Sequence, residues 1–209
     1  KMATAMRTTG SFGSVSIADK HEVSLIKQDR RSFVDSYIPK VYKDYDMIMA
    51  ITNKHRKAIN HKIRACEGRT SPVPEIGETL VCLRNDYVSQ RFISNGERFV
   101  VKNVVASPHK NAHRYQIQSV DMPDGFTLAV DVDDDMFSFN ESVSKDNVGN
   151  RELRSFTYGY CLTVHKCQGS GFPRVLYIDQ DLSFMDMDMQ AIRYTAITRA
   201  QEKLTVVRV

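Results

Sequence analysis

The sequence lacks several features that would mark whole classes of protein. Its four cysteines, Cys66, Cys82, Cys161 and Cys167, form no CxxC pair and show no Cys/His zinc spacing, which favours free thiols in a reducing cytosol. No run approaches the roughly 18 apolar residues that a membrane span needs. A secretory signal, internal repeats and low-complexity tracts are also missing. These absences argue against a secreted disulfide scaffold, a helical membrane protein and a repeat array.

What is present is an ordinary globular composition. Of the 209 residues, 42% are hydrophobic and 26% are charged, so a core of normal size can form. This length suits one large domain, or a domain that carries a smaller inserted one. The net charge of +4 is compatible with a nucleic-acid partner but does not decide for one, because many enzymes with neutral substrates carry as much.

The first forty residues predict a lead-in followed by a helix. Residues 1–16 contain Gly10 and Gly13 and are expected to be flexible. Over residues 20–43, apolar side chains are spaced by threes and fours. This spacing predicts an amphipathic helix that stops near Pro39.

A strand, a polar cap and a helix are predicted next. Residues 46–51 form a short apolar run of strand length, and Thr52 and Asn53 follow as a helix N-cap. Residues 54–64 then predict a basic helix with its apolar side chains, Ala58, Ile59 and Ile63, facing inward. The cations of this helix suit either a DNA-backbone face or an ordinary solvated surface.

Residues 77–150 differ in character from the sequence on either side. Short alternating runs lie at residues 79–83, 98–105, 115–120 and 126–132. Asn95-Gly96 is a strong turn signal between two of these runs, and strands this short and close predict a small β-barrel. The acidic stretch at residues 131–135 is expected to be a solvated loop, because its adjacent carboxylates lack the spacing of an EF-hand.

The remaining sequence returns to α/β style. Strands are predicted at residues 160–164, 174–178 and 203–209, a short helical turn at residues 165–168 ending at Gly169, and a helix at residues 187–197. The expected fold class is therefore α/β, with a β module inserted into the middle of an α/β domain. The α/β domain would comprise residues 1–76 and 151–209, and the module residues 77–150.

The first chemically informative segment is residues 158–176. An apolar strand there ends in hydroxyl, imidazole, ammonium and amide groups, and a Gly-Ser-Gly sequence follows. Open α/β sheets bind ligands beyond the carboxyl ends of their strands. Thr163, His165 and Lys166 are suitable donors for phosphate oxygens, and the backbone N–H groups of residues 169–171 could also face an anion. Considered alone, the same segment suits an ordinary turn between strands.

The second segment, residues 191–206, predicts a helix that ends in Thr198-Arg199 just before a strand. One interpretation makes Arg199 a surface side chain paired with Glu202. The other makes it the fixed guanidinium that stabilises charge on a transferring phosphoryl group, as an arginine finger does. The segment by itself leaves both interpretations open.

Together, in this order and about 30 residues apart, the two segments resemble motifs V and VI of superfamily 1 helicases. Residues 162–170, LTVHKCQGS, are similar to the family's LTVHKAQGSE, and residues 194–200, YTAITRA, to its YTALTRA. Residues 77–97 resemble RecD-like members around Asn85-Asp86-Tyr87 and Asn95-Gly96. Residues 49–53, with Asn60 and Arg64, resemble motif IVa of RecD-like and Dda-type phage helicases. The resemblance covers roughly residues 46–209.

This resemblance implies the second RecA-like domain of a RecD-like or Dda-type DNA helicase, a parallel-sheet α/β fold with an SH3-like β-barrel inserted before motif V. It implies that Arg199 reaches the γ-phosphate of ATP held by another domain, and that Gln168, Gly169 and Ser170 line the same cleft. It also implies contacts to the backbone of single-stranded DNA from Thr52, Asn53, Thr163, His165 and Lys166. Hydrolysis would open and close two RecA-like domains and move the protein along DNA, 5′→3′ by analogy with this branch.

The other half of such an active site is not encoded here. The sequence contains no G-x-x-x-x-G-K-S/T loop and no Walker B strand, so phosphoryl transfer lacks its platform. We therefore expect ATP and Mg²⁺ to be held mainly by an N-terminal RecA-like domain outside this sequence. The expected partners are single-stranded DNA and replication or recombination proteins, and the expected location is the cytoplasm of a bacterium or a phage-infected cell.

Three positions need separate comment. Gly171 stands where many relatives have a glutamate that contacts the nucleotide. Cys161 and Cys167 replace common alanines, which we interpret as packing changes. Arg7 is a possible remnant of motif IV, which supplies a second phosphate-contacting arginine in relatives.

Two other functions remain as alternatives. A helicase-like module without catalysis would grip single-stranded nucleic acid or a protein and have no motor cycle. An unrelated α/β phosphate-binding enzyme would need a phosphate loop of its own, and this sequence contains none.

Overall fold

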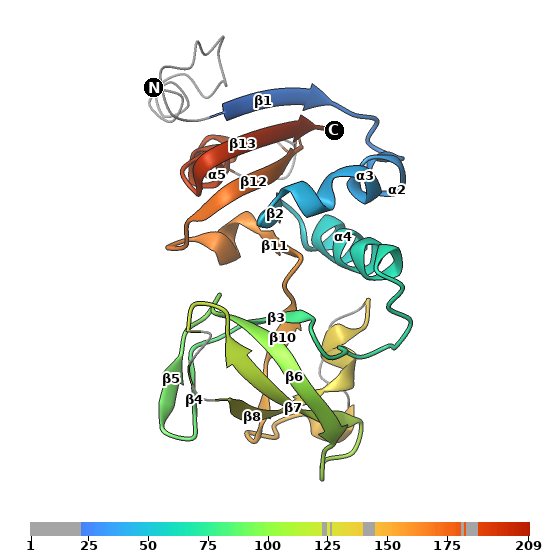
Figure 1. Cartoon of the computed structure of the whole chain (residues 1–209), viewed down its shortest axis with the longest axis vertical. Helices are drawn as coiled ribbons and strands as arrows, with labels where there is room; N and C mark the ends of the chain where they lie inside the picture. The colour runs from blue at the N-terminus through green and yellow to red at the C-terminus, as the bar shows by residue number, and fades with distance from the viewer. Residues whose placement is uncertain (1–21, 123–124, 126, 140–144, 181, 183–187) are drawn as a thin grey trace. The chain divides into compact units, whose positions relative to one another are not determined.

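A computed structural model describes residues 22–122, 125, 127–139, 145–180, 182 and 188–209 of the chain (Figure 1). These residues form two compact units. The first unit contains the described residues up to Cys66 and those from Tyr160 to Val209, and the second contains those from Glu67 to Gly159. The predicted lead-in and Arg7 lie outside the described residues.

The first unit is built on a five-stranded sheet whose strands all run parallel, in the order β1-β13-β12-β2-β11. The strands are β1 (Glu22–Lys27), β2 (Met47–Ala50), β11 (Cys161–Thr163), β12 (Phe172–Asp179) and β13 (Ala200–Arg208). Every residue of the interior strand β2 is buried, as expected for a parallel sheet covered on both faces. The predicted α/β fold class with a parallel sheet is confirmed.

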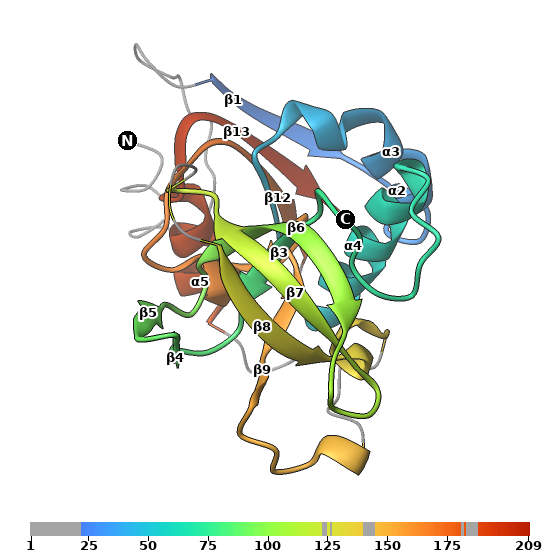
Figure 2. The ribbon, with the colours of Figure 1, turned by 60° about the horizontal axis from the view of Figure 1, so that its bottom comes forward.

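Helices lie on both faces of this sheet (Figures 1 and 2). On one face, α2 (Phe33–Ser36), α3 (Ile38–Val41) and α4 (Asn53–Cys66) pack against inward side chains of the strands, among them Ile48, Leu176 and Ile178. On the other face, α5 (Met189–Ile197) bonds Asp179 through Arg193. Because neighbouring residues of a strand point to opposite faces, Ile178 and Asp179 place α4 and α5 on opposite sides.

The helix predicted over residues 20–43 is wrong in its first part. Glu22–Lys27 forms strand β1, which pairs in parallel with β13 at the edge of the sheet. Leu25 is 58% exposed there although it is apolar. The spacing of apolar residues in this segment therefore does not follow the side chains that are buried, and it could not distinguish a strand from a helix. Pro39 lies in the first turn of α3 and does not end it, because the fixed φ and missing N–H of proline suit that position.

The strand, cap and helix predicted after it are confirmed as β2, Thr52 and α4. The Thr52 hydroxyl accepts the backbone N–H of His55 at 3.3 Å, which is the N-cap bond. Ile59 and Ile63 face the core as predicted. Arg56 and Arg64 of the basic face are buried, so neither proposed role applies to these two arginines. For the other cations of the helix both roles stay predictions.

The second unit is a six-stranded sheet in the order β10-β3-β6-β7-β8-β9, accompanied by a β4–β5 hairpin. The strands are β3 (Thr79–Cys82), β4 (Asp86–Val88), β5 (Arg91–Ile93), β6 (Arg98–Ala106), β7 (Ala112–Ser119), β8 (Leu128–Asp133), β9 (Leu153–Arg154) and β10 (Phe156–Tyr158). Only Ser155 separates β9 from β10 along the chain, yet these strands stand at opposite ends of the order. The sheet therefore curls round until its two ends meet. The Asn95-Gly96 turn is confirmed between β5 and β6, with Gly96 at a φ of 90°.

Two predictions about this unit differ from the structure. The predicted module began at residue 77 and ended at residue 150, whereas β9 and β10 lie beyond that end and pair with β8 and β3 of the same sheet. The acidic stretch 131–135 is not a solvated loop. Asp131 of β8 pairs with Arg114 on the neighbouring strand β7. The Asp133 side chain is buried and accepts the N–H of Asp135. The SH3-like nature of the module stays a prediction.

Candidate nucleotide and nucleic-acid site

The predicted DNA-binding residues follow the carboxyl ends of neighbouring parallel strands, whereas Arg199 and the turn at residues 168–170 precede the amino ends of β13 and β12. Thr163, the last residue of β11, lies opposite Ala50, the last residue of β2, and Ala50 also lies opposite Ile178 of β12 (Figure 1). The side chains that come next along each strand therefore meet at one edge of the sheet, where open α/β sheets bind ligands.

The N-terminus of α4 gives this edge a positive potential. The backbone N–H of Arg56 bonds the Thr52 carbonyl at 3.1 Å, and the first turn holds no acidic residue. A helix of this length concentrates partial positive charge at its N-terminus, which favours a phosphate there. Asn53 is exposed, and its side-chain oxygen accepts from the Arg56 guanidinium at 3.2 Å. Thr52 and Asn53 are therefore placed where a nucleic-acid backbone could bind.

The segment after β11 is a single 3-10 turn, η4 (Val164–Cys167), that presents polar side chains from buried anchors. Val164 and Cys167 point into the core, while His165 is exposed and Lys166 is half-buried. Thr163 is 8% exposed, so its side chain offers a ligand much less surface than that of His165. The predicted DNA-binding residues of this segment thus share one edge with Thr52 and Asn53 but differ in accessibility.

Asn60 fixes the strand that carries this segment. Its side-chain nitrogen donates to the Cys161 carbonyl at 3.1 Å, and its side-chain oxygen accepts the Cys161 N–H at 2.7 Å. Both groups are buried. Because β11 is an edge strand, this amide completes the hydrogen bonding that a further strand would have supplied.

Gln180 at the same edge was missed by the sequence reasoning, and His55 was counted only among the basic residues of the helix. The imidazole of His55 lies 2.9 Å from the Thr52 hydroxyl through Nδ1 and 3.4 Å from the Gln180 amide through Nε2. Burial lowers the pKa of His55, and the charges of Arg30 and Lys54 lower it further, against a smaller raising effect from Gln180. The signal that could have identified Gln180 is its position directly after the carboxyl end of the buried strand β12. Thr52 has a similar position two residues after β2.

The two chemically informative segments meet at Arg199. Its Nη1 donates to the Ser170 carbonyl at 3.1 Å, its Nε to the Thr195 carbonyl at 3.2 Å and its Nη2 to the Thr198 hydroxyl at 3.0 Å. These bonds hold the guanidinium beside the turn formed by Gln168, Gly169 and Ser170. A guanidinium has five N–H groups, so further donors remain for an anion. Across the ranges that the structure describes, Arg199 makes no ion pair with Glu202, the partner in the surface interpretation.

The backbone of this turn offers an anion less than the sequence suggested. The Gln168 N–H bonds the His165 carbonyl at 3.3 Å, and the Ser170 N–H bonds the Cys167 carbonyl at 3.2 Å. Gly169 adopts a φ of 86°, which closes the turn and favours glycine. The expectation of a row of outward N–H groups at residues 169–171 is therefore wrong at Ser170, and side chains must provide more of any binding.

Gly171 has a structural explanation. A Cβ built at this position would lie 2.6 Å from the side-chain nitrogen of Gln201, so the Gln201 amide occupies the space in which a glutamate side chain would begin. The cysteines agree with their interpretation as packing residues. Cys161 and Cys167 are fully buried free thiols, and burial raises the pKa of Cys161 far above its usual value.

The position of α5, and with it Arg199, depends on a buried carboxylate. Asp179 is fully buried at the end of β12 and accepts from Arg193 at 2.9 Å, from the Tyr177 hydroxyl at 3.2 Å and from Arg208 at 3.4 Å. Burial, and then the charge of Asp179, raise the pKa of Tyr177, which keeps its hydroxyl a donor. These hydrogen bonds hold α5 against the sheet. Asp179 therefore affects the site only by fixing the position of α5 and of Arg199 after it.

Neither a metal-binding group nor a membrane-spanning helix occurs in the described residues. Among them, no set of three or more His, Cys, Asp and Glu side chains could hold a metal ion. In the same part of the chain, every helix is too short or too polar to cross a bilayer.

Comparison with known proteins finds a family that the last part of the chain resembles. Residues 158–207 match the family described as the UvrD-like helicase C-terminal domain. This segment contains both η4 with its following turn and α5 with Arg199. The match shows that this segment is similar to a helicase C-terminal domain. No curated protein sequence is significantly similar to the chain.

Several solved helicase structures are weakly similar to the chain. The Pif1 helicase from Candida albicans is 14% identical with a TM-score of 0.45, and the similarity covers 77% of this chain and 44% of that one. Bacteroides Pif1 bound to ssDNA is 14% identical with a TM-score of 0.42, covering 76% of this chain and 40% of that one. The chain thus spans less than half the length of these proteins. Likenesses of this size do not establish what the chain does.

Proposed function

We propose that the chain is the C-terminal motor half of an ATP-dependent helicase or translocase that moves along single-stranded DNA. The observation that carries the proposal is the 3.1 Å bond from Arg199 to the Ser170 carbonyl, which joins two segments 29 residues apart into one cationic site. Both segments lie within residues 158–207, the part of the chain that matches a helicase C-terminal domain.

In this proposal Arg199 acts on ATP that another domain brings. Its guanidinium, held by three hydrogen bonds, stabilises the charge that develops on the transferring phosphoryl group. Gln168, Gly169 and Ser170 line the same cleft, and the side chains of Gln168 and Ser170 are its polar groups. Mg²⁺ does not fit the described residues, which hold no carboxylate cluster, so its ligands would belong to the other domain.

The carboxyl-terminal edge of the sheet would form part of the DNA track, whereas Arg199 precedes the amino end of β13. Thr52, Asn53, Thr163, His165 and Lys166 contact phosphate oxygens in the proposal, supported by the N-terminus of α4. A nucleotide-driven change in the distance between two RecA-like domains would then move the strand past this edge.

The finer assignments rest on the motif resemblance. We assign the protein to the RecD-like or Dda-type branch, with an SH3-like module at the second unit and movement 5′→3′. The same assignment implies a cytoplasmic enzyme that works with replication or recombination proteins. It further requires that the complete polypeptide carry a G-x-x-x-x-G-K-S/T loop.

The test uses the complete polypeptide and three variants. Arg199→Ala should lower DNA-stimulated ATP turnover by about a thousandfold while single-strand affinity persists. Arg174→Ala is the matched control, because this arginine is 45% exposed and its guanidinium is already occupied by an ion pair with Asp46. Thr163→Ala combined with His165→Ala should weaken strand binding and flatten its dependence on salt.

The outcomes separate the proposal from its alternatives. Normal turnover in Arg199→Ala would remove the role given to this arginine. An unchanged salt slope in the double variant would show that the β11 edge does not meet phosphate. Strand binding by the complete polypeptide without any ATP turnover would establish the non-catalytic module instead.

A further inference from the structure

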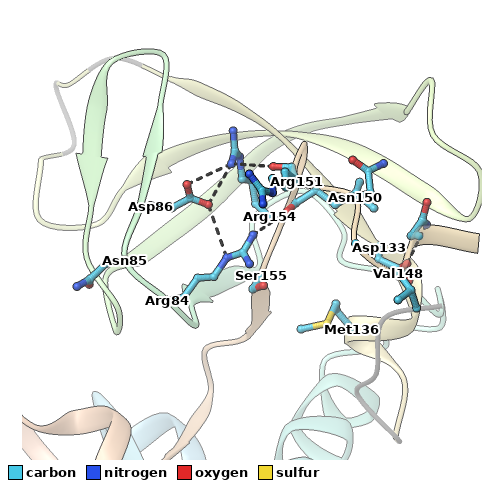
Figure 3. Close-up of a pocket in the computed structure, with 13 residues that line it drawn as sticks. Arg84, Asn85, Asp86, Asp133, Met136, Val148, Asn150, Arg151, Arg154 and Ser155 are labelled. Atoms are coloured by element: carbon cyan, nitrogen blue, oxygen red, sulfur yellow. Dashed lines mark hydrogen bonds and ion pairs between the residues drawn. The ribbon is translucent and has the colours of Figure 1, made fainter. Parts of the chain in front are cut away.

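The second unit contains a pocket that the proposed motor does not use. Its volume is about 700 Å³, a size suited to a small ligand or a short peptide. It lies between the segment before β4, the segment that follows Asn147 and strand β9 (Figure 3). Three arginines line it, namely Arg84, Arg151 and Arg154.

Two of these arginines are held in place by one carboxylate. Asp86 accepts from Arg154 Nη1 at 3.1 and 3.2 Å, and Arg84 Nε lies 3.8 Å from it. Arg84 Nη2 also donates to the Leu153 carbonyl at 3.0 Å. Figure 3 shows Arg84 and Arg154 converging on Asp86. Because these bonds fix the side chains, a ligand would not have to order them, and N–H groups of both guanidinium ions remain for it.

The pocket favours an anion. Arg151 is exposed, and in the described part of the chain its guanidinium has no partner. The other carboxylate of the lining, Asp133, is 1% exposed and accepts from Asn147 at 2.8 Å and from the Asp135 N–H at 2.9 Å. Asp86 alone therefore faces three arginines, which leaves the cationic groups in excess.

The remaining lining favours a polypeptide over a nucleic acid. Met136, Leu153 and Val148 add apolar surface, and Val148 is 74% exposed. No aromatic residue lines the pocket in the part of the chain that the structure describes, whereas single-stranded nucleic acids are usually held by stacking on aromatic rings.

We propose that this pocket binds an acidic segment of another protein. A carboxylate of that segment is held by Arg84, Arg151 and Arg154, and an apolar side chain next to it packs on Val148 and Met136. Charge-assisted hydrogen bonds from arginine to carboxylate provide the affinity, and the apolar contact selects peptides over free anions. The site is independent of the ATP and DNA roles proposed above.

The experiment measures fluorescence anisotropy of the 209-residue chain with a defined set of labelled hexapeptides. Each peptide carries two aspartates and one apolar residue at a varied position, and the same peptides with asparagine for aspartate serve as the ligand control. Arg151→Glu and Arg154→Gln are the pocket variants. Lys102→Glu is the matched control, because it makes the same charge change at an exposed position of β6 outside the pocket.

The proposal expects saturable binding of aspartate peptides, at least about tenfold weaker in Arg151→Glu and unchanged in Lys102→Glu. Arg154→Gln should also weaken binding, and an unchanged circular dichroism spectrum shows that the fold survives. The proposal is overturned if no aspartate peptide binds, or if Lys102→Glu weakens binding as much as Arg151→Glu. It is also overturned if an oligothymidylate displaces the peptides and loses affinity equally in Arg151→Glu, since the pocket would then hold nucleic acid.

Discussion

Asn60→Ala is the substitution that most directly tests how the sheet edge is built. The wild-type side chain makes two buried bonds to the backbone of Cys161, at 2.7 and 3.1 Å. Alanine removes both partners and leaves a buried N–H and a buried carbonyl of an edge strand unpaired. Each such group costs about 1–3 kcal/mol, so the variant should lose about 3 kcal/mol of unfolding free energy. This is a large part of the roughly 5–15 kcal/mol that stabilises an ordinary domain.

The assay follows unfolding of the first unit in urea by circular dichroism, since the chain has no tryptophan to report by fluorescence. Hydrogen exchange of the peptide containing Cys161 provides a local readout. We expect faster exchange of that amide in Asn60→Ala, together with the loss of stability. Lys54→Ala is the control, because Lys54 is exposed at the start of the same helix.

The reasoning would be refuted by a loss below about 1 kcal/mol, or by unchanged exchange at Cys161 in a destabilised variant. The first result would mean that water replaces the amide at little cost. The second would mean that Asn60 stabilises α4 rather than β11. Because β11 carries Thr163 and η4, a confirmed effect would also predict weaker strand binding by the complete polypeptide.

Two further substitutions test the second unit. In Gly159→Ala the new Cβ would lie 2.8 Å from Thr79 Cγ2 and 3.2 Å from the Thr79 carbonyl, so we expect a loss of about 1–3 kcal/mol in urea unfolding. Adding Thr79→Ser removes that methyl group and should restore part of the loss. No restoration would show that the contacts with Val81 Cγ2, at 3.1 Å, and with the Thr79 carbonyl dominate. For Arg114→Gln, burial acts to raise the pKa of Asp131, but the bonds and charge of Arg114 outweigh it and the pKa lies below its usual value. The stabilisation of the folded state by the ionised Asp131 is therefore present above the pKa that Asp131 has in the unfolded chain. It is lost as the pH falls through the lower pKa that Asp131 has in the folded chain. The variant should therefore be less stable than wild type near pH 7 and equal to it in strong acid, and a difference that persists in acid would contradict the assignment.

The parts of the fold that were predictable from sequence are those with local signals. An apolar strand followed by Thr52 and a periodic helix could be identified because cap, strand and helix are contiguous. The turn after β11 and the helix ending at Arg199 were placed for the same reason, although the bond between Arg199 and Ser170 could be anticipated only from the motif resemblance.

The parts that were missed depend on contacts between distant residues. Strand β1 exists because it pairs with β13 at the far end of the chain, and an exposed edge strand carries little pattern of its own. Gln180 meets His55 across 125 residues, so neither residue marks the other in the sequence. Asp133 looked like part of a solvated acidic run, but its burial depends on Asn147 and on a turn of the backbone.

The pairing of β3 with β10 has a consequence for how the second unit is accommodated. These strands run antiparallel, with Leu80 opposite Tyr158 and Cys82 opposite Phe156, so the chain enters and leaves this body at adjacent positions. Neighbouring strands are about 4.8 Å apart, and the entropy of closing a loop depends on how far apart its ends must be held. The entropy cost of connecting α4 to β11 through the second unit is therefore little more than that of a short hairpin loop. Exchange of this body for another of different size would leave the connection from α4 to β11 intact, provided that the replacement also begins and ends on paired strands.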